Sequence, residues 1–246
     1  MYKTLRGLVL REVKYKESSK MLTVLTEEGK LSCEGRGAMR KGSKIAAAAQ
    51  QLTLSELTLF ENRGRYTLTE ASVVEDFSAL REDFADFSLG VYFAELLETV
   101  SDEEYPNPAL LSLGLNGLFA LSRRLYAAEH IKACFELRLC ALAGFAPELT
   151  ACAVCGEKNP ERPRLNLRGG VLHCAECRTE GRSAELCPAS LAAMRHVTHA
   201  DAKKIYSFTL DAEAEKRFRY ACEQFLLSQL DRGFGSLDYW RSISHH

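Results

Sequence analysis

The residues best suited to chemistry are two pairs of cysteines, Cys152 with Cys155 and Cys174 with Cys177. Each pair has the form Cys-x-x-Cys, and eighteen residues separate Cys155 from Cys174. This spacing is typical of four-thiolate zinc sites, because each turn directs two sulfur atoms at one point and two turns complete a tetrahedron. Gly156 suits the tight turn after the first pair, since glycine tolerates positive φ. The pattern predicts about one structural zinc ion per chain.

Other cysteine chemistry fits this pattern less well. A redox dithiol needs a single Cys-x-x-Cys in a strand-then-helix context, which the sequence does not show. Two disulfides are disfavoured in a reducing compartment. A deaminase-type zinc site needs His-x-Glu and Pro-Cys-x-x-Cys, and the chain has neither. His173, next to Cys174, is the residue that could replace a thiolate, but it needs no such role.

Composition and cysteine usage place the chain in a reducing compartment. Its 246 residues, 46% hydrophobic and 26% charged, are enough for one large domain or two smaller ones. No apolar run reaches the ~18 residues of a membrane span, and the N-terminus lacks a signal peptide's apolar stretch. The nine cysteines are an odd number, with four in metal spacing. We therefore expect a cytoplasmic protein without membrane contact, in which His245 and His246 are a tag remnant or tail.

Residues 1–78 are predicted to form a small β-barrel. Short strands with turn residues between them are expected at 4–14, 20–26, 30–35, 52–61 and 65–71. Five strands without a long helix favour an OB-fold, a barrel that binds oligonucleotides on one face.

Positive charge is concentrated in this barrel region. Residues 1–45 contain eleven Lys or Arg and five acidic residues, whereas the whole chain has a net charge of −1. Such asymmetry favours a nucleic-acid partner, although solvated strand faces would explain it as well. The glycine-containing loop at 35–44 is expected to contact phosphates, or else to be a flexible connection. The candidate DNA-binding residues are Arg11, Lys14, Lys20, Arg36, Arg40, Lys41 and Lys44, with Tyr2, Tyr15 and Tyr66 as weaker candidates for base stacking.

Helical periodicity begins near residue 78. Helices are expected at 81–100, from Pro108 to about 125, at 127–143, at 189–197 and from Asp211 to about 233, with Asn107 and Asp211 as N-caps. The sequence between the cysteine pairs is loop-like and is not expected to form a core of its own. The predicted fold class is therefore α+β and multidomain. It comprises an OB-fold at 1–78, a helical domain at 79–147 and 188–243, an inserted four-cysteine zinc module at 148–187, and a tail at 244–246.

No catalytic constellation was found. The chain has neither a Gly-x-x-x-x-Gly-Lys-Ser/Thr phosphate loop nor a Gly-x-Ser-x-Gly nucleophile elbow. We therefore expect a binding protein and not an enzyme. Two alternatives stay open: a zinc-ribbon and OB-fold adaptor acting on RNA or in transcription, and a metal-dependent nuclease or base-modifying enzyme, the nuclease site being assembled from scattered acids.

Several segments, in this order and spacing, resemble the bacterial RecO family across essentially the whole chain. The segments are Gly7-Leu-Val-Leu-Arg11, Tyr15-Lys-Glu-Ser-Ser-Lys20, Thr26-Glu-Glu-Gly-Lys30, the loop at 35–44, Pro106-Asn-Pro108, Phe135-Glu-Leu-Arg-Leu139, Gly144-Phe-Ala-Pro147 and the cysteine quartet.

The resemblance implies a DNA repair and recombination mediator of the RecF pathway, associated with the bacterial nucleoid. Such proteins bind single- and double-stranded DNA and anneal complementary strands without ATP. Their implied partners are RecR, the C-terminal tail of single-stranded DNA-binding protein and, indirectly, RecA. The zinc module occurs in only some members. Outside the barrel region, this chain is more acidic than expected for a family member whose DNA contacts extend far beyond the barrel.

Overall fold

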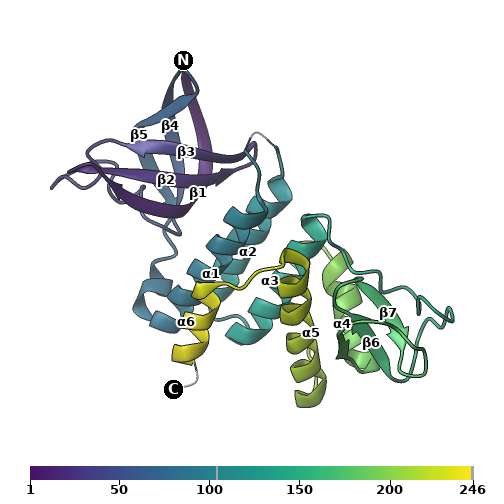
Figure 1. Ribbon diagram of the computed structural model, residues 1–246. Coiled ribbons are helices and arrows are strands. Elements are labelled where there is room, and N and C mark those ends of the chain that lie inside the picture. The colour runs from purple at the N-terminus through teal and green to yellow at the C-terminus, as the bar shows by residue number, and fades with distance from the viewer. Residues whose placement is uncertain (104, 245–246) are drawn as a thin grey trace. The chain divides into compact units, whose positions relative to one another are not determined.

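The computed structural model describes residues 1–103 and 105–244 (Figure 1). The chain divides into two compact units. The first comprises Met1–Arg123 with the C-terminal segment from Gly235, and the second comprises Arg124–Phe234. The domain boundaries expected at 78, 147 and 187 stay predictions, and residues 245 and 246 of the expected tail lie outside the described residues. No described helix combines the length and apolarity needed to cross a bilayer.

The first unit contains the expected five-stranded barrel. Its strands are β1 (Tyr2–Tyr15), β2 (Ser19–Thr26), β3 (Gly29–Gly35), β4 (Leu54–Asn62) and β5 (Arg65–Glu75). They close in the order β1-β2-β3-β5-β4, with parallel pairing between β3 and β5 and antiparallel pairing elsewhere (Figure 1). This barrel confirms the predicted OB-like fold.

Successive residues along a strand point to opposite faces, which explains why apolar side chains fill the interior of the barrel. Val9, Leu22, Val24, Leu57 and Leu59 are fully buried and belong to one apolar cluster, as expected for side chains of alternate residues that point to one face. The long strand β1 pairs with β4 through its first half and with β2 from Gly7 onward, with an irregularity between Val9 and Arg11. A bulge of this kind bends a strand, which lets one strand serve both neighbours around the barrel.

The basic loop after β3 is anchored to the barrel. Ala38, Ile45 and Ala49 are buried in the same apolar cluster as the strands, and the amide of Met39 donates to the carbonyl of Ser18 over 2.9 Å. The segment is therefore held in place at these residues. Its cations are exposed, and their contact with phosphates stays a prediction.

Helices complete the first unit. A 3₁₀ turn η1 (Ser78–Glu82) precedes α1 (Phe84–Val100), followed by α2 (Pro108–Ser122) and, after the second unit, α6 (Gly235–Ser244). The side chain of Asp83 accepts from the first amides of α1, and that of Asn107 accepts from the amide of Leu110, as an N-cap does. The sequence prediction missed α6, which packs against α1 and buries Leu237 and Trp240.

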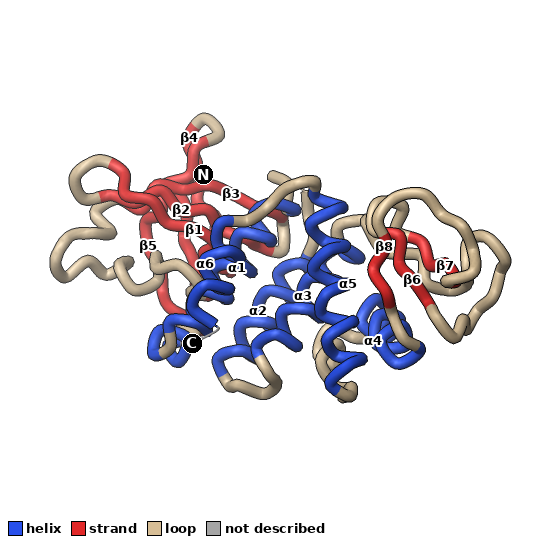
Figure 2. The backbone as a smooth tube through the Cα atoms, turned by 60° about the horizontal axis from the view of Figure 1, so that its bottom comes forward, coloured by secondary structure: helices blue, strands red, loops and turns tan. Residues whose placement is uncertain are grey.

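The second unit combines three helices with a small sheet. The helices are α3 (Ala128–Leu142), α4 (Pro188–His199) and α5 (Ala212–Leu230), and Asp211 caps α5 as predicted. The sheet comprises β6 (Pro163–Asn166), β7 (Val171–Cys174) and β8 (Ser183–Glu185), in the order β7-β6-β8 (Figure 2).

The segment between the cysteine pairs is not loop throughout, as was expected, because it contains β6 and β7. Leu165, Leu172 and Ala184 are fully buried, one on each strand of the small sheet. The expectation that the segment forms no core of its own stays a prediction. Strands of three or four residues are too short to show alternation in a sequence. The turn between β6 and β7 includes Gly170 at φ +64°, a left-handed conformation that favours glycine.

Candidate metal centre and nucleic-acid face

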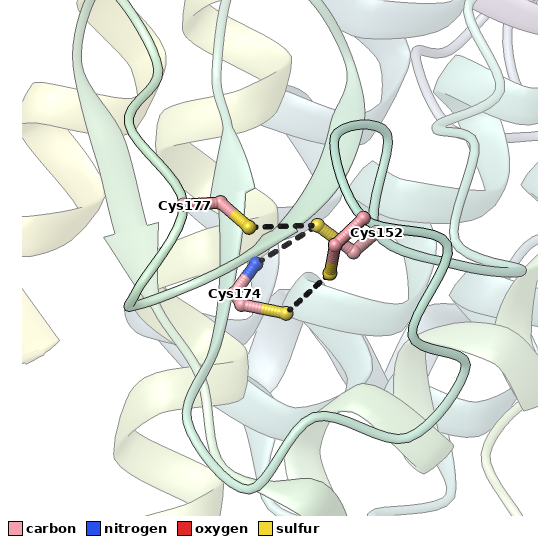
Figure 3. Close-up of side chains that lie close together, drawn as sticks. Cys152, Cys174 and Cys177 are labelled. Carbon is pink, nitrogen blue, oxygen red and sulfur yellow. Dashed lines mark hydrogen bonds between the residues drawn. The ribbon is translucent and has the colours of Figure 1, made fainter.

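The four cysteines predicted to bind metal converge on one point. Their sulfur atoms all lie within 4.8 Å of one another. The Sγ atoms of Cys152 and Cys177 are 3.7 Å apart, and those of Cys155 and Cys174 are 3.5 Å apart (Figure 3). Thiolates around zinc at ~2.3 Å in a tetrahedron would be separated by about 3.8 Å. The donor set and its spacing therefore fit a tetrahedral thiophilic metal ion.

Two tight turns hold the sulfur atoms. The first begins after Leu149, and Gly156 closes it at φ +79° with its amide donating to the carbonyl of Cys152 over 2.9 Å. The second follows β7, which ends at Cys174, and the amide of Cys177 donates to the carbonyl of Cys174 over 3.3 Å. Strand β7 and the turn that follows it thus place the second cysteine pair next to the first.

The electrostatics of the turns favour a thiolate at Cys152. Burial raises the pKa of this thiol, but backbone amides of Cys155, Val154 and Cys174 donate to its sulfur, outweigh the burial and lower the pKa to about 6. The amide of Cys174 lies 3.3 Å from the sulfur (Figure 3). Hydrogen bonding to the Cys155 side chain, followed by burial, raises the pKa of Cys177 to about 11. The backbone amides around Cys152 therefore favour its thiolate, the form of cysteine that binds a metal ion.

His173 does not belong to the cysteine cluster. Its side chain is 2% exposed, with Nε2 lying 2.9 Å from the hydroxyl of Ser183 and Nδ1 lying 3.1 Å from the carbonyl of Cys174. These hydrogen bonds satisfy both ring nitrogens and give the histidine a structural role.

The predicted DNA-binding residues fall into two groups. Three are paired with acids: Arg11 with Glu98, Lys20 with Glu12, and Arg36 with Glu34. The other four are exposed and have no carboxylate partner within the described residues: Lys14, Arg40, Lys41 and Lys44.

A groove of about 940 Å³ lies on the barrel beside β3 and the β1–β2 and β4–β5 turns. In OB-folds these turns and the strands between them are the part that binds oligonucleotides. Among the described residues, the acids that line the groove are Glu28, Glu34 and Glu103. The cations and tyrosines that line it are Lys3, Lys16, Lys30, Arg36, Arg65, Tyr15 and Tyr66.

Sequence reasoning found only part of this groove. Of the seven predicted cations only Arg36 lines it, and two of the three tyrosines do. Tyr2 instead contacts Phe60, with ring centroids 5.1 Å apart. Lys16 and Arg65 were missed. Their positions in the turn after β1 and at the start of β5 would have identified them, had the OB strand order been used to locate the binding face.

Comparison with known proteins identifies the class of protein that the barrel and the helices define. The family described as "Recombination protein O N terminal" matches residues 1–77 and "Recombination protein O C terminal" matches residues 81–238. The chain therefore belongs to the RecO family of DNA repair proteins.

Its relatives are similar along most of their length. The chain is 34% identical over 223 residues to "DNA repair protein RecO" of Exiguobacterium sibiricum, covering 89% of this chain and 88% of the relative. It is 29% identical over 240 residues to the protein of the same name from Alkaliphilus metalliredigens, covering 96% and 98%. The corresponding values for Symbiobacterium thermophilum are 30% over 239 residues, covering 95% and 94%.

Proposed function

We propose that this protein is a recombination mediator that binds single- and double-stranded DNA through its barrel and anneals complementary strands without ATP. The observation that supports this most directly is the groove at the oligonucleotide-binding position of the OB-like barrel, lined by five cations and two tyrosines. Family membership supports a role in DNA repair.

The proposed annealing mechanism is electrostatic. Two DNA strands repel each other, and cations that contact phosphates on both strands lower that repulsion without a chemical step. We assign one strand to the groove, where Lys16 and Arg65 contact phosphates and Tyr15 and Tyr66 stack on bases. We assign the second strand to the exposed cations of the loop after β3. Because this mechanism needs no bond cleavage, we propose that the protein is not an enzyme.

The partners implied by the family complete the proposal. We propose that the protein acts in the cytoplasm on the nucleoid, together with RecR, to help RecA replace single-stranded DNA-binding protein on single strands. The C-terminal tail of that binding protein is proposed to dock on the helices. The RNA or transcription adaptor is not favoured, because the family matches describe recombination proteins.

We propose zinc as the metal of the cysteine cluster. Four thiolates with no open coordination position are typical of structural zinc sites, in which metal binding stabilises the fold. Cys152, Cys155, Cys174 and Cys177 would hold the ion, and the ion would supply no reaction.

Annealing of two complementary labelled oligonucleotides tests the proposed function. We expect the wild-type protein to accelerate annealing without nucleotide, and high salt to abolish the acceleration. No acceleration at low salt would contradict the proposal. Incubation of DNA with Mg²⁺ or Mn²⁺ provides the second readout, since cleavage that persists through stringent purification would favour the nuclease alternative.

A further inference from the structure

The first cysteine turn is tied to helix α4 by one arginine. The Nε atom of Arg195 donates to the carbonyl of Leu149 over 2.8 Å, and Nη2 donates to the carbonyls of Thr150 over 3.2 Å and Lys158 over 2.5 Å. Nη1 donates to Oδ1 of Asn159 over 3.0 Å. These four acceptors stand on both sides of Cys152 and Cys155. One guanidinium group therefore closes the segment that carries the first two thiols.

We propose that Arg195 is a positioning residue for metal binding, which holds the turn of Cys152 and Cys155 in the geometry that receives the ion. None of its four hydrogen-bond acceptors is a cysteine sulfur, so it acts through the backbone.

Apart from Arg195, the segment is held by hydrogen bonds of its own backbone, such as those from the amides of Cys152 to the carbonyl of Glu157 over 2.7 Å and of Ala153 to that of Leu172 over 2.8 Å, and hardly by packing. Residues 153–159 are exposed, and burial is confined to Cys152 and Pro160 at its ends. Exposed loops of this kind lose considerable conformational entropy when they are ordered. Because Arg195 fixes three carbonyls and one amide oxygen before the ion binds, metal binding has to order less of the segment and loses less conformational entropy.

The helix that carries Arg195 is itself well anchored. Leu191, Met194 and Val197 of α4 are buried. The Nη1 atom of Arg138, on α3, donates to the carbonyl of Val197 over 3.4 Å and also to that of Thr198. Arg195 therefore connects the exposed turn to the core of its unit.

Lysine cannot replace arginine in this arrangement. The planar guanidinium presents five N–H donors in a fixed fork, which suits acceptors that lie on different sides of it. A lysine ammonium is a single point at the end of a flexible chain. Arg195→Lys keeps the charge and most of the stem, so it tests the hydrogen-bond geometry with little loss of packing.

The experiment compares metal affinity in full-length wild type, Arg195→Lys and Asn159→Ala. Zinc affinity is measured by competition with a chromophoric chelator, and Co²⁺ absorption reports whether four thiolates still form a tetrahedral site. We expect Arg195→Lys to lower zinc affinity by about 10- to 100-fold, as is usual when a group that orients metal ligands is lost. Asn159→Ala removes only one of the four hydrogen bonds, so its loss should be smaller.

The matched control is Arg164→Lys, a substitution of the same kind on strand β6 of the small sheet. The side chain of Arg164 pairs with the exposed Glu185 over 3.0 Å, and the four acceptors of Arg195 are other residues, so the zinc affinity of this variant should stay at the wild-type value. The inference would be overturned if Arg195→Lys bound zinc with wild-type affinity. It would also be overturned if the substitution destabilised the metal-free and the metal-loaded protein equally. Absence of metal binding in the wild type would instead contradict the proposed zinc site. Should Arg195→Lys fail to fold, the affinity of Asn159→Ala decides, and a wild-type value there overturns the inference.

Discussion

The Nζ atom of Lys16 lies 3.4 Å from Oε1 of Glu34, whose other carboxylate oxygen lies 3.4 Å from Nε of Arg36. Glu34 therefore pairs with two cations of the barrel groove at once and offsets part of their charge. Its side chain is only 16% exposed, which keeps the carboxylate close to both. A DNA phosphate would compete with Glu34 for the same two cations.

Glu34→Gln is expected to strengthen DNA binding. The amide is uncharged, so it removes the competitor and leaves Lys16 and Arg36 available to phosphate. We expect single-stranded DNA affinity to rise about 3- to 10-fold at low salt, as for charge changes at an interface. Equilibrium titration of a labelled oligonucleotide measures it. Glu70→Gln, an exposed residue of β5 opposite Thr58, is the control. An unchanged affinity in Glu34→Gln would contradict this role.

The double substitution Arg40→Ala with Lys41→Ala tests the loop after β3. Both side chains are exposed and contact phosphates in the proposed mechanism, so binding to any DNA sequence should weaken by a similar factor. Loss of two phosphate contacts should also flatten the slope of log affinity against log salt by about 1.4 for single strands. Unchanged affinity with an intact fold would count against the loop.

Thiol reactivity at pH 8 tests the metal centre. Burial raises the pKa of Cys33 to about 12 and also raises the pKa values of Cys134, Cys140 and Cys222, so these thiols carry little thiolate and should be unreactive while folded. Cys187 is half-buried and should react.

A colorimetric thiol reagent should therefore count one fast thiol in metal-loaded protein and nine after denaturation. Chelation should add at least two fast thiols, those of Cys152, whose pKa is lowered, and of Cys155, which is exposed. A count that chelation leaves unchanged would show that the quartet holds no metal.

Helix α6 is expected to contribute substantially to stability. Trp240 is 5% exposed, whereas its neighbour Tyr239 is 57% exposed. Trp240→Ala should lower the free energy of unfolding by about 3 to 5 kcal/mol, because a large buried aromatic side chain is lost. Tyr239→Ala should change it by about 0.5 kcal/mol or less. Urea denaturation measures both, and equal losses would show that α6 is not held by its buried face.

Local patterns in the sequence were sufficient for much of the fold and for the cysteine cluster. Turn residues between short apolar segments placed the five strands of the barrel, side-chain caps placed the starts of α2 and α5, and Cys-x-x-Cys spacing identified all four thiols that the structure brings together. Each of these signals lies within a few residues along the chain.

Features that depend on distant segments were missed. The strands β6, β7 and β8 are too short for periodicity, and the sheet they form joins segments up to about twenty residues apart in the chain. The groove combines residues from β1 to β5, so the roles of Lys16 and Arg65 depend on closure of the barrel. Arg195 is 46 residues from Leu149 in the chain, and no local pattern links them.

The most direct test of the central claim is the anisotropy of a fluorescent single-stranded oligonucleotide titrated with protein at several salt concentrations. We predict tight binding by the wild type at low ionic strength that weakens steeply with salt. In the variant with Lys16→Ala and Arg65→Ala, affinity should fall and the salt slope should flatten by about 1.4. A wild-type protein that leaves the anisotropy unchanged at low ionic strength would contradict the claim that the barrel's cations hold DNA.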